Sequence, residues 1–204
     1  MAEHCVDLLQ QHRIGRLLDA GGGDGYLPAY LHRRMASDAA AIDATVLDHD
    51  HRVLAQVPAP MRTVCGRLED LDASTGQFGT ILLRQVLHYV VCPDTALRTL
   101  GRRLESGGVL YVGQMVAPDP ASADWLGNWA NWISTTRLRV WTPDSLFDIF
   151  STSGLLTERA KLVPYWQRLA SAAGASPPRS PVLGQDSPGF GRIHWLHATL
   201  RIRS

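Results

Sequence analysis

The feature that most constrains this chain is the stretch LLDAGGGDGYL at residues 17–27. An apolar run ends at Asp19, and glycine then occupies four of the five positions from 21 to 25. A short buried strand that ends in a glycine loop and leads into a helix is typical of the first strand-to-helix turn of an open parallel sheet. Because glycine allows unusual backbone angles and close approach, we expect this loop to hold a ligand.

The rest of the chain alternates between short apolar runs and longer amphipathic runs, the pattern of a parallel sheet with helices on both faces. We expect parallel strands over 15–20, 43–48, 61–65, 79–85 and 108–116, and an antiparallel pair over 156–166 and 193–202. We expect helices over 26–36, 51–57, 93–104 and 142–154, the last with Thr142 as its cap, Pro143 at its first position and Gly154 as its stop.

Composition limits the class of protein. The 204 residues suffice for one large α/β domain, and the net charge of +1 gives no bulk attraction for nucleic acid or acidic membranes. The apolar runs are too short to span a bilayer, and the stretch MAEHCVDLLQQHR lacks the pattern of a secretion signal. We therefore expect a cytoplasmic protein with no nucleic-acid or membrane partner.

Cysteine and histidine offer little for a metal or a disulfide. Cys5, Cys65 and Cys92 are isolated, so we expect buried thiols without a disulfide framework. The stretch LDHDH at residues 47–51 is the alternative metal site, but neighbouring residues of a strand end rarely converge on one ion. The sequence thus predicts no metal.

The spacing of the glycines separates two ligand classes. A dinucleotide loop has the spacing Gly-x-Gly-x-x-Gly, but the third position is Tyr26 when counted from Gly21, and the second is Asp24 when counted from Gly22. Asp19 and Asp24 also flank the loop and would repel a pyrophosphate. A ligand with a positive charge, such as an amino group and a sulfonium, fits better.

The run Asp19-x-Gly21-x-Gly23-x-Gly25 resembles the glycine loop of class I S-adenosylmethionine-dependent methyltransferases. Three further blocks follow in that family's order: VLDHD, FGTILLRQVLHYV and LRTLGRRLESGGVLYVGQM. The resemblance covers about residues 14–116. It implies a Rossmann-like fold with a seven-stranded, mostly parallel sheet whose last strand is antiparallel, and S-adenosylmethionine as the cofactor, with S-adenosylhomocysteine as the product.

The resemblance also implies which residues bind the cofactor. Asp48 would take the two ribose hydroxyls, since a carboxylate offers two acceptor oxygens. The family usually has an aspartate for the adenine amino group where this chain has Arg67. Either the backbone around Leu68 and the carboxylate of Glu69 or Asp70 takes over that role, with Leu68 packing on the adenine, or adenine is bound more weakly. The predicted cofactor-binding residues are Asp19, Gly21, Gly22, Gly23, Gly25, Asp48, His49, Leu68, Glu69 and Arg84.

His88 is the candidate catalytic residue. It lies in a VLH run similar to the one that carries the catalytic histidine of plant-type O-methyltransferases, and a histidine can act as a base near neutral pH. The alternative is a polar packing residue. A helix that carries Trp125, Trp129 and Trp132 on one face would form an aromatic wall or pack on the sheet. The predicted substrate-binding residues are Gln85, His88, Tyr89, Gln114, Trp129 and Trp132.

We therefore expect one methyltransferase domain over residues 1–204, with its cofactor-binding core at 14–116 and segments 117–142 and 168–191 covering a small-molecule substrate. The methyl group would go to oxygen, with carbon or nitrogen as alternatives, and a homodimer or a partner subunit would complete the site. Two rivals stay open. One is a non-catalytic subunit of the same fold, motivated by Arg67, and the other binds S-adenosylmethionine but catalyses a different reaction, such as a cyclisation.

Overall fold

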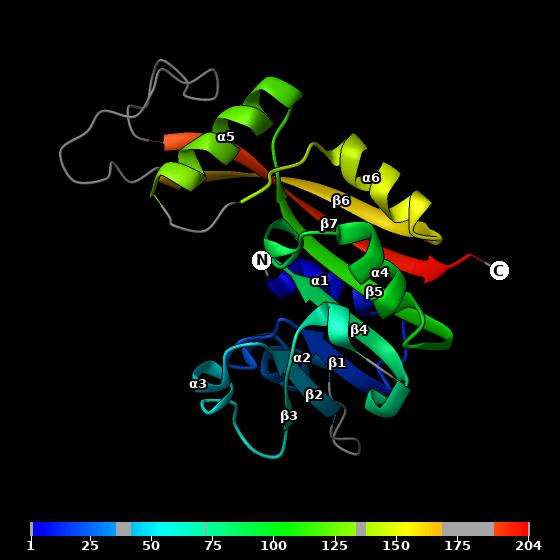
Figure 1. Ribbon diagram of the computed structural model, residues 1–204. Coiled ribbons are helices and arrows are strands. Elements are labelled where there is room, and N and C mark those ends of the chain that lie inside the picture. The colour runs from blue at the N-terminus through cyan, green and yellow to red at the C-terminus, as the bar shows by residue number, and fades with distance from the viewer. Residues whose placement is uncertain (1, 36–41, 72, 134–137, 169–189, 204) are drawn as a thin grey trace.

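In a computed structural model, which describes residues 2–35, 42–71, 73–133, 138–168 and 190–203, one seven-stranded sheet runs through the protein (Figure 1). Its strand order is β3-β2-β1-β4-β5-β7-β6. The first five strands pair in parallel, whereas β7 is antiparallel to both β5 and β6, which confirms the predicted topology. The strands are β1 (Arg16–Ala20), β2 (Asp43–Asp48), β3 (Arg62–Cys65), β4 (Phe78–Arg84), β5 (Leu104–Val116), β6 (Leu155–Arg168) and β7 (Phe190–Ile202).

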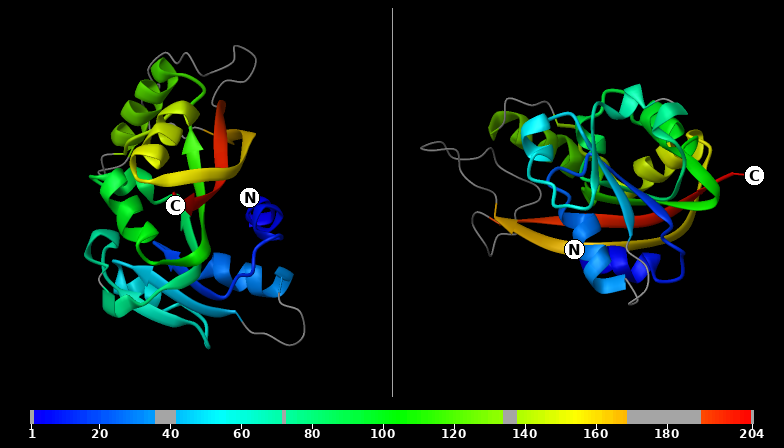
Figure 2. Two further views of the ribbon diagram at one scale, coloured as in Figure 1. Left: turned by 90° about the vertical axis from the view of Figure 1, so that its right-hand side faces the viewer. Right: turned by 90° about the horizontal axis from the view of Figure 1, so that it is seen from below.

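Helices cover both faces of the sheet (Figure 2). Helices α1 and α2 pack on one face, and α4 and α6 pack on the other. Helix α5 lies beyond the carboxyl end of β5, beside the carboxyl end of β6 and the amino end of β7 (Figure 1). The helices are α1 (Ala2–Leu9), α2 (Tyr26–Met35), α3 (His51–Leu54), α4 (Pro93–Gly101), α5 (Pro120–Ile133) and α6 (Pro143–Thr152).

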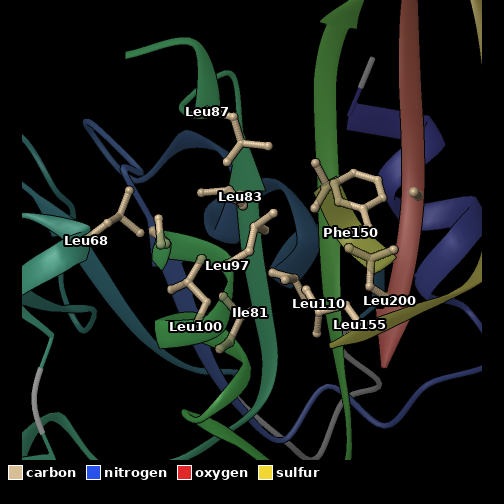
Figure 3. Packing of buried hydrophobic residues seen from close by; sticks show 14 of the residues in the cluster. Leu68, Ile81, Leu83, Leu87, Leu97, Leu100, Leu110, Phe150, Leu155 and Leu200 are labelled. Atoms are coloured by element: carbon tan, nitrogen blue, oxygen red, sulfur yellow. The ribbon is translucent and has the colours of Figure 1, made fainter. Parts of the chain in front are cut away.

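The two cores follow from the two-residue period of the strands. In β1, Leu17 joins the cluster beneath α1 and α2, whereas its neighbour Leu18 joins the cluster beneath α4 and α6. The same alternation separates Leu82 from Ile81 and Leu83 in β4. Figure 3 shows the second cluster, in which Ile81 and Leu83 pack with leucines of α4 and with Phe150 of α6. Strands buried on both faces read as continuous apolar runs, as a central parallel sheet requires.

Helix α6 begins and ends where its sequence signals predict. The Thr142 hydroxyl accepts a hydrogen bond from the backbone N–H of Ser145 at 3.3 Å, and the Ser145 hydroxyl accepts one from the backbone N–H of Thr142 at 3.0 Å. This reciprocal capping box satisfies two amide groups that a helix start would otherwise leave unpaired. Pro143 takes the first helical position, and Gly154 follows the helix in a left-handed conformation.

Several boundaries differ from the predictions, and helix α1 was missed. Helices α3 and α4 end at Leu54 and Gly101, earlier than expected. Strand β5 starts at Leu104 rather than at residue 108, because Leu104 pairs with Phe78 before the register shifts. The chain must therefore leave α4 sooner. Helix α1 was not predicted, although its buried residues, such as Cys5 and Leu9, pack against the sheet.

Candidate functional site

The glycine loop lies where β1 ends and is held against β2. The backbone N–H groups of Gly21 and Gly22 both donate to the carbonyl oxygen of Leu47, at 2.8 and 3.0 Å. Gly21 has a φ of +73°, and any side chain there would collide with Val86. A Cβ at Gly22 would lie 2.5 Å from the Asp19 carboxyl carbon. Glycine is therefore required at both positions by the close approach of neighbouring groups.

Asp19 lies beneath this loop and is only 3% exposed. Its Oδ2 has no hydrogen-bond partner among the described residues. The pKa of this carboxyl is raised from 3.8 to about 7. Burial is the main cause, the nearby Arg84 opposes it, and Asp48 and Asp24 add to the increase. A buried carboxyl without a full set of partners is unfavourable in its charged form. The site consequently suits a ligand that brings a positive charge.

Asp48 ends β2 beside the same loop. Its Oδ2 accepts the backbone N–H of Gly23 at 3.1 Å, and its Oδ1 accepts that of Asp50 at 3.0 Å. The ring Nδ1 of His49 lies 3.2 Å from Oδ1. These contacts fix the orientation of the carboxylate, while an ionised carboxylate has about four acceptor positions. Asp48 therefore has capacity left for two hydroxyl groups.

A cavity of about 660 Å³ opens next to the loop, and we call it the loop cavity. It brings together five predicted cofactor residues (Gly21, Asp48, His49, Leu68 and Glu69) and the predicted substrate residue Tyr89. The full lining is Gly21, Leu47, Asp48, His49, Gly66, Arg67, Leu68, Glu69, Val86, Tyr89 and Val90. The predicted residues Asp19, Gly22, Gly23, Gly25 and Arg84 are not among the described lining residues, and all but Arg84 lie in or under the loop.

Arg67 is the departure from the family pattern, and its surroundings bear on adenine binding. Its side chain is 65% exposed, and its Nε lies 3.7 Å from a carboxylate oxygen of Glu69. Both residues line the loop cavity, as does the buried Leu68 between them. An apolar side chain and a carboxylate are thus present at this position, although the guanidinium occupies part of the carboxylate's capacity.

A second cavity, of about 680 Å³, lies between the end of β4 and helix α5, and we call it the α5 cavity. Tyr89 and Val90 line both cavities, so the two adjoin. The α5 cavity also contains His88, Asp124 and Arg139, which give it one formal charge of each sign. Its lining is His88, Tyr89, Val90, Val91, Ala123, Asp124, Gly127, Asn128, Leu138, Arg139 and Val140.

His88, Gln114 and Gln85 form one hydrogen-bonded cluster. Gln114 is 1% exposed, and its Nε2 lies 2.8 Å from the Nδ1 of His88 and 3.0 Å from the Oε1 of Gln85. Burial lowers the pKa of His88 to about 4. Gln85 and Gln114 were predicted to bind substrate, but among the described residues they stand behind His88 and do not line either cavity.

Helix α5 presents to its cavity a different face from the one that carries Trp125. Trp125 is buried in a cluster with Ala117, Leu126 and Ile193, so its role is packing. The side chains of Trp129 and Trp132 lie outside the part of the molecule that the structure describes. The cavity face carries Ala123, Asp124, Gly127 and Asn128, which the sequence analysis missed. Their spacing of four residues was the available signal.

Two further observations concern the described residues only. None of them forms a group of three or more His, Cys, Asp or Glu side chains that could hold a metal ion, and Asp50 of the LDHDH stretch instead pairs with Arg52. Within the same described part of the chain, none of the helices has the length and apolar character needed to cross a membrane. The predicted covering segment at 168–191 falls almost wholly outside the described residues.

Comparison with known proteins gives concordant matches. The model of the methyltransferase domain family matches residues 4–158. An uncharacterized methyltransferase of Mycobacterium tuberculosis, Rv0089, is 33% identical over 115 residues, which span 55% of this chain and 57% of that protein. The chain therefore matches little more than half the length of this relative.

Solved structures match nearly the whole chain. The YcgJ protein of Bacillus subtilis superposes with a TM-score of 0.77 at 15% identity, covering 100% of this chain and 98% of that one. The 1,6-didemethyltoxoflavin-N1-methyltransferase of Burkholderia thailandensis, solved with S-adenosylhomocysteine and 1,6-didemethyltoxoflavin, has a TM-score of 0.65 at 16% identity, covering 99% and 77%. At 15% and 16% identity, these two structures show that the chain shares their fold.

Proposed function

The chain belongs to the methyltransferase domain family of class I fold, and on that premise we propose that it transfers a methyl group from S-adenosylmethionine to an oxygen of a small molecule. The observation that carries the proposal is the pair of adjoining cavities that share Tyr89 and Val90. One cavity borders the glycine loop and its acidic side chains, and the other contains His88. Two ligands bound side by side can react only if their sites meet, as these do.

The residues of the loop cavity fit S-adenosylmethionine. The unpartnered Oδ2 of Asp19 lies under the loop, where the amino group of the methionine part would supply a donor and a positive charge. Asp48 would accept from the ribose hydroxyls, and Leu68 would pack on the adenine, with Glu69 near its amino group. When bound, this cofactor supplies a methyl group activated by a positively charged sulfur.

The α5 cavity would hold the methyl acceptor. Its volume of about 680 Å³ falls in the usual range for small-molecule sites, and its lining mixes apolar side chains with a few polar ones. We propose that residues 117–142 and 168–191 cover it, as the resemblance implies, within a single domain over residues 1–204. The protein would hold the two molecules in line and exclude water, which accounts for most of what methyl transfer needs.

The first test is titration calorimetry of the purified protein with S-adenosylmethionine and then with S-adenosylhomocysteine. We expect micromolar binding of both, and Gly23→Val should abolish it. Gly154→Val is the matched control, since Gly23 and Gly154 have φ values of +59° and +78° and neither has an atom within 3.4 Å of the added Cβ. Only Gly23 lies in the loop, so the control should bind like the wild type.

The second test follows S-adenosylhomocysteine formation against a panel of small-molecule acceptors. Production that depends on one acceptor supports methyl transfer. Binding of S-adenosylmethionine without this product would instead favour the cyclisation-type alternative. The absence of binding, with a folded protein, would favour a non-catalytic subunit in which Arg67 disables the adenine site, and a co-purifying partner chain should then be sought.

A further inference from the structure

We infer that His88 presents an N–H donor, and not a basic lone pair, to the α5 cavity, and that the protein therefore methylates an acceptor whose oxygen is already anionic at neutral pH. This inference rests on the proposed methyl transfer for its substrate class. The inferred tautomer of His88 does not depend on which reaction the protein catalyses. Gln85 and Gln114 act as positioning residues.

A backbone amide at the end of β5 determines the tautomer. The N–H of Met115 can only donate, and it donates to the Oε1 of Gln85 at 3.2 Å. The side-chain atom of Gln114 that lies 3.0 Å from the same Oε1 must also be a donor, so it is the NH₂ group. That NH₂ group lies 2.8 Å from the Nδ1 of His88. Nδ1 must consequently accept, and the ring proton of neutral His88 is on Nε2.

The backbone of Gln85 is strained in this arrangement. Gln85 has a φ of +56°, in the left-handed region that residues other than glycine seldom adopt. Such a conformation is unfavourable and persists only when the surroundings impose it. Here the backbone N–H of Gln85 donates to the carbonyl of Gly113 at 2.9 Å, which ties the end of β4 to β5. The side chain is thereby directed at Met115 and Gln114.

His88 lies at the wall of the α5 cavity. His88 lines the α5 cavity, and its carbonyl oxygen accepts the backbone N–H of Arg139 at 3.3 Å, which anchors the residue. Within the described residues Nε2 has no hydrogen-bond partner. Because burial lowers the pKa of His88 to about 4, the ring stays neutral at physiological pH. The polar group it offers is thus a single N–H.

A neutral imidazole whose only lone pair is already engaged cannot take a proton from the acceptor. Asp124 also lines the cavity, but a carboxylate is a far weaker base than a phenolate. An ordinary phenol, with a pKa of about 10, would therefore remain protonated at neutral pH. A carboxylic acid, an acidic enol of a 1,3-dicarbonyl compound or an acidic phenol arrives as the anion. In that case the oxygen lone pair forms the bond to the methyl carbon, the carbon–sulfur pair stays on sulfur, and no proton moves. The N–H of His88 holds the anion in place.

The tautomer is tested by nitrogen NMR on the protein without ligand. Long-range proton–nitrogen spectra of ¹⁵N-labelled protein at pH 7.5 distinguish the protonated ring nitrogen from the bare one. We expect His88 to carry its proton on Nε2, and Gln114→Glu to move it to Nδ1, since a carboxylate must accept. Wild-type protein with the proton on Nδ1 would overturn the inference. This measurement needs no turnover, so it is separate from a failure of the proposed function.

The role is tested by two substitutions of similar size at His88. His88→Gln retains an N–H donor near the position of Nε2, whereas His88→Leu retains none. With a carboxylic acid or acidic phenol as acceptor, we expect His88→Gln to stay within about tenfold of the wild-type rate and His88→Leu to lose roughly 10–100-fold. Equal losses in both variants, or faster turnover of unactivated phenols and alcohols than of acidic acceptors, would overturn the donor role.

Discussion

Replacing Asp19 by asparagine should make the protein more stable and, at the same time, weaken its binding of S-adenosylmethionine. Asp19 is 3% exposed, and its Oδ2 has no partner among the described residues. The ionised carboxylate thus loses its hydration on folding without a full set of hydrogen bonds. Asparagine has the same shape but carries no charge, so it avoids most of this cost.

The magnitude follows from the pKa of the carboxyl. Burial raises it from 3.8 to about 7. Between these values the folded state holds a proton that the unfolded state has released, so this residue makes stability fall as pH rises from about 4 to 7. The difference corresponds to about 4 kcal/mol in full. Asp19→Asn should therefore be nearly neutral at pH 4 and more stable than the wild type by up to about 4 kcal/mol at pH 8.

Urea unfolding of the wild type and Asp19→Asn at several pH values between 4 and 8 measures this difference. Asp148→Asn, at an exposed carboxyl of α6, serves as the control and should show no such trend. A difference between the wild type and Asp19→Asn that stays constant with pH would mean that Asp19 titrates alike in the folded and unfolded chain. Calorimetry of the same variant should show affinity for S-adenosylmethionine reduced about 10–100-fold, the usual loss when a charged hydrogen-bond partner is removed.

Three other predictions concern Thr142 at the start of α6, Asp48 at the end of β2 and the buried His197 of β7. Thr142→Ala should lower the free energy of unfolding by about 1 kcal/mol because it removes the capping box of α6, and an unchanged urea midpoint would contradict this. Asp48→Ala should weaken S-adenosylmethionine binding by about 1–3 kcal/mol in calorimetry, and an unchanged dissociation constant would exclude it from the site. His197 is fully buried, its Nδ1 lies 2.7 Å from the Tyr111 hydroxyl, and burial lowers its pKa from 6.5 to about 4. The unfolded chain therefore takes up the proton first, and His197 should cost about 3 kcal/mol of stability as pH falls from 6.5 to 4. Urea unfolding of His197→Gln, compared with the wild type over this range, should show that loss removed.

The parts of the fold that could be predicted are those whose signal is local. Strands β1 and β2, which end at Ala20 and Asp48, were found because each apolar run is followed directly by polar or glycine residues. Thr142, Pro143 and Gly154 marked the limits of α6 in the same way. These signals arise from backbone preferences and caps, which act over a few residues.

Helix α1 was missed because its stability is not local. It has eight residues, fewer than an isolated helix needs in water. Its buried Cys5 and Leu9 instead pack with Leu82 and Tyr111 of the central strands, far away in the sequence. A helix held mainly by such contacts gives only a weak pattern in the sequence.

The hydrogen-bonded cluster around His88 could not be predicted either, because it too depends on contacts that are distant in the sequence. From the sequence, His88, Gln85 and Gln114 were predicted one by one as substrate-binding residues. They meet because the register of β4 on β5 places Arg84 opposite Gly113, so the residues that follow each strand come together. Register between strands that are distant in sequence depends on the packed core, and a single sequence does not display it.

The two adjoining cavities have a consequence for how this enzyme could diversify. Among the described residues, Tyr89 and Val90 alone line both cavities, and seven of the eleven residues around the α5 cavity lie between positions 123 and 140. Under the proposed function, most contacts with the acceptor other than that of His88 therefore come from two neighbouring stretches of the chain, residues 123–128 and 138–140. Exchanging these residues between family members should transfer the preference for an acceptor and leave the affinity for S-adenosylmethionine unchanged.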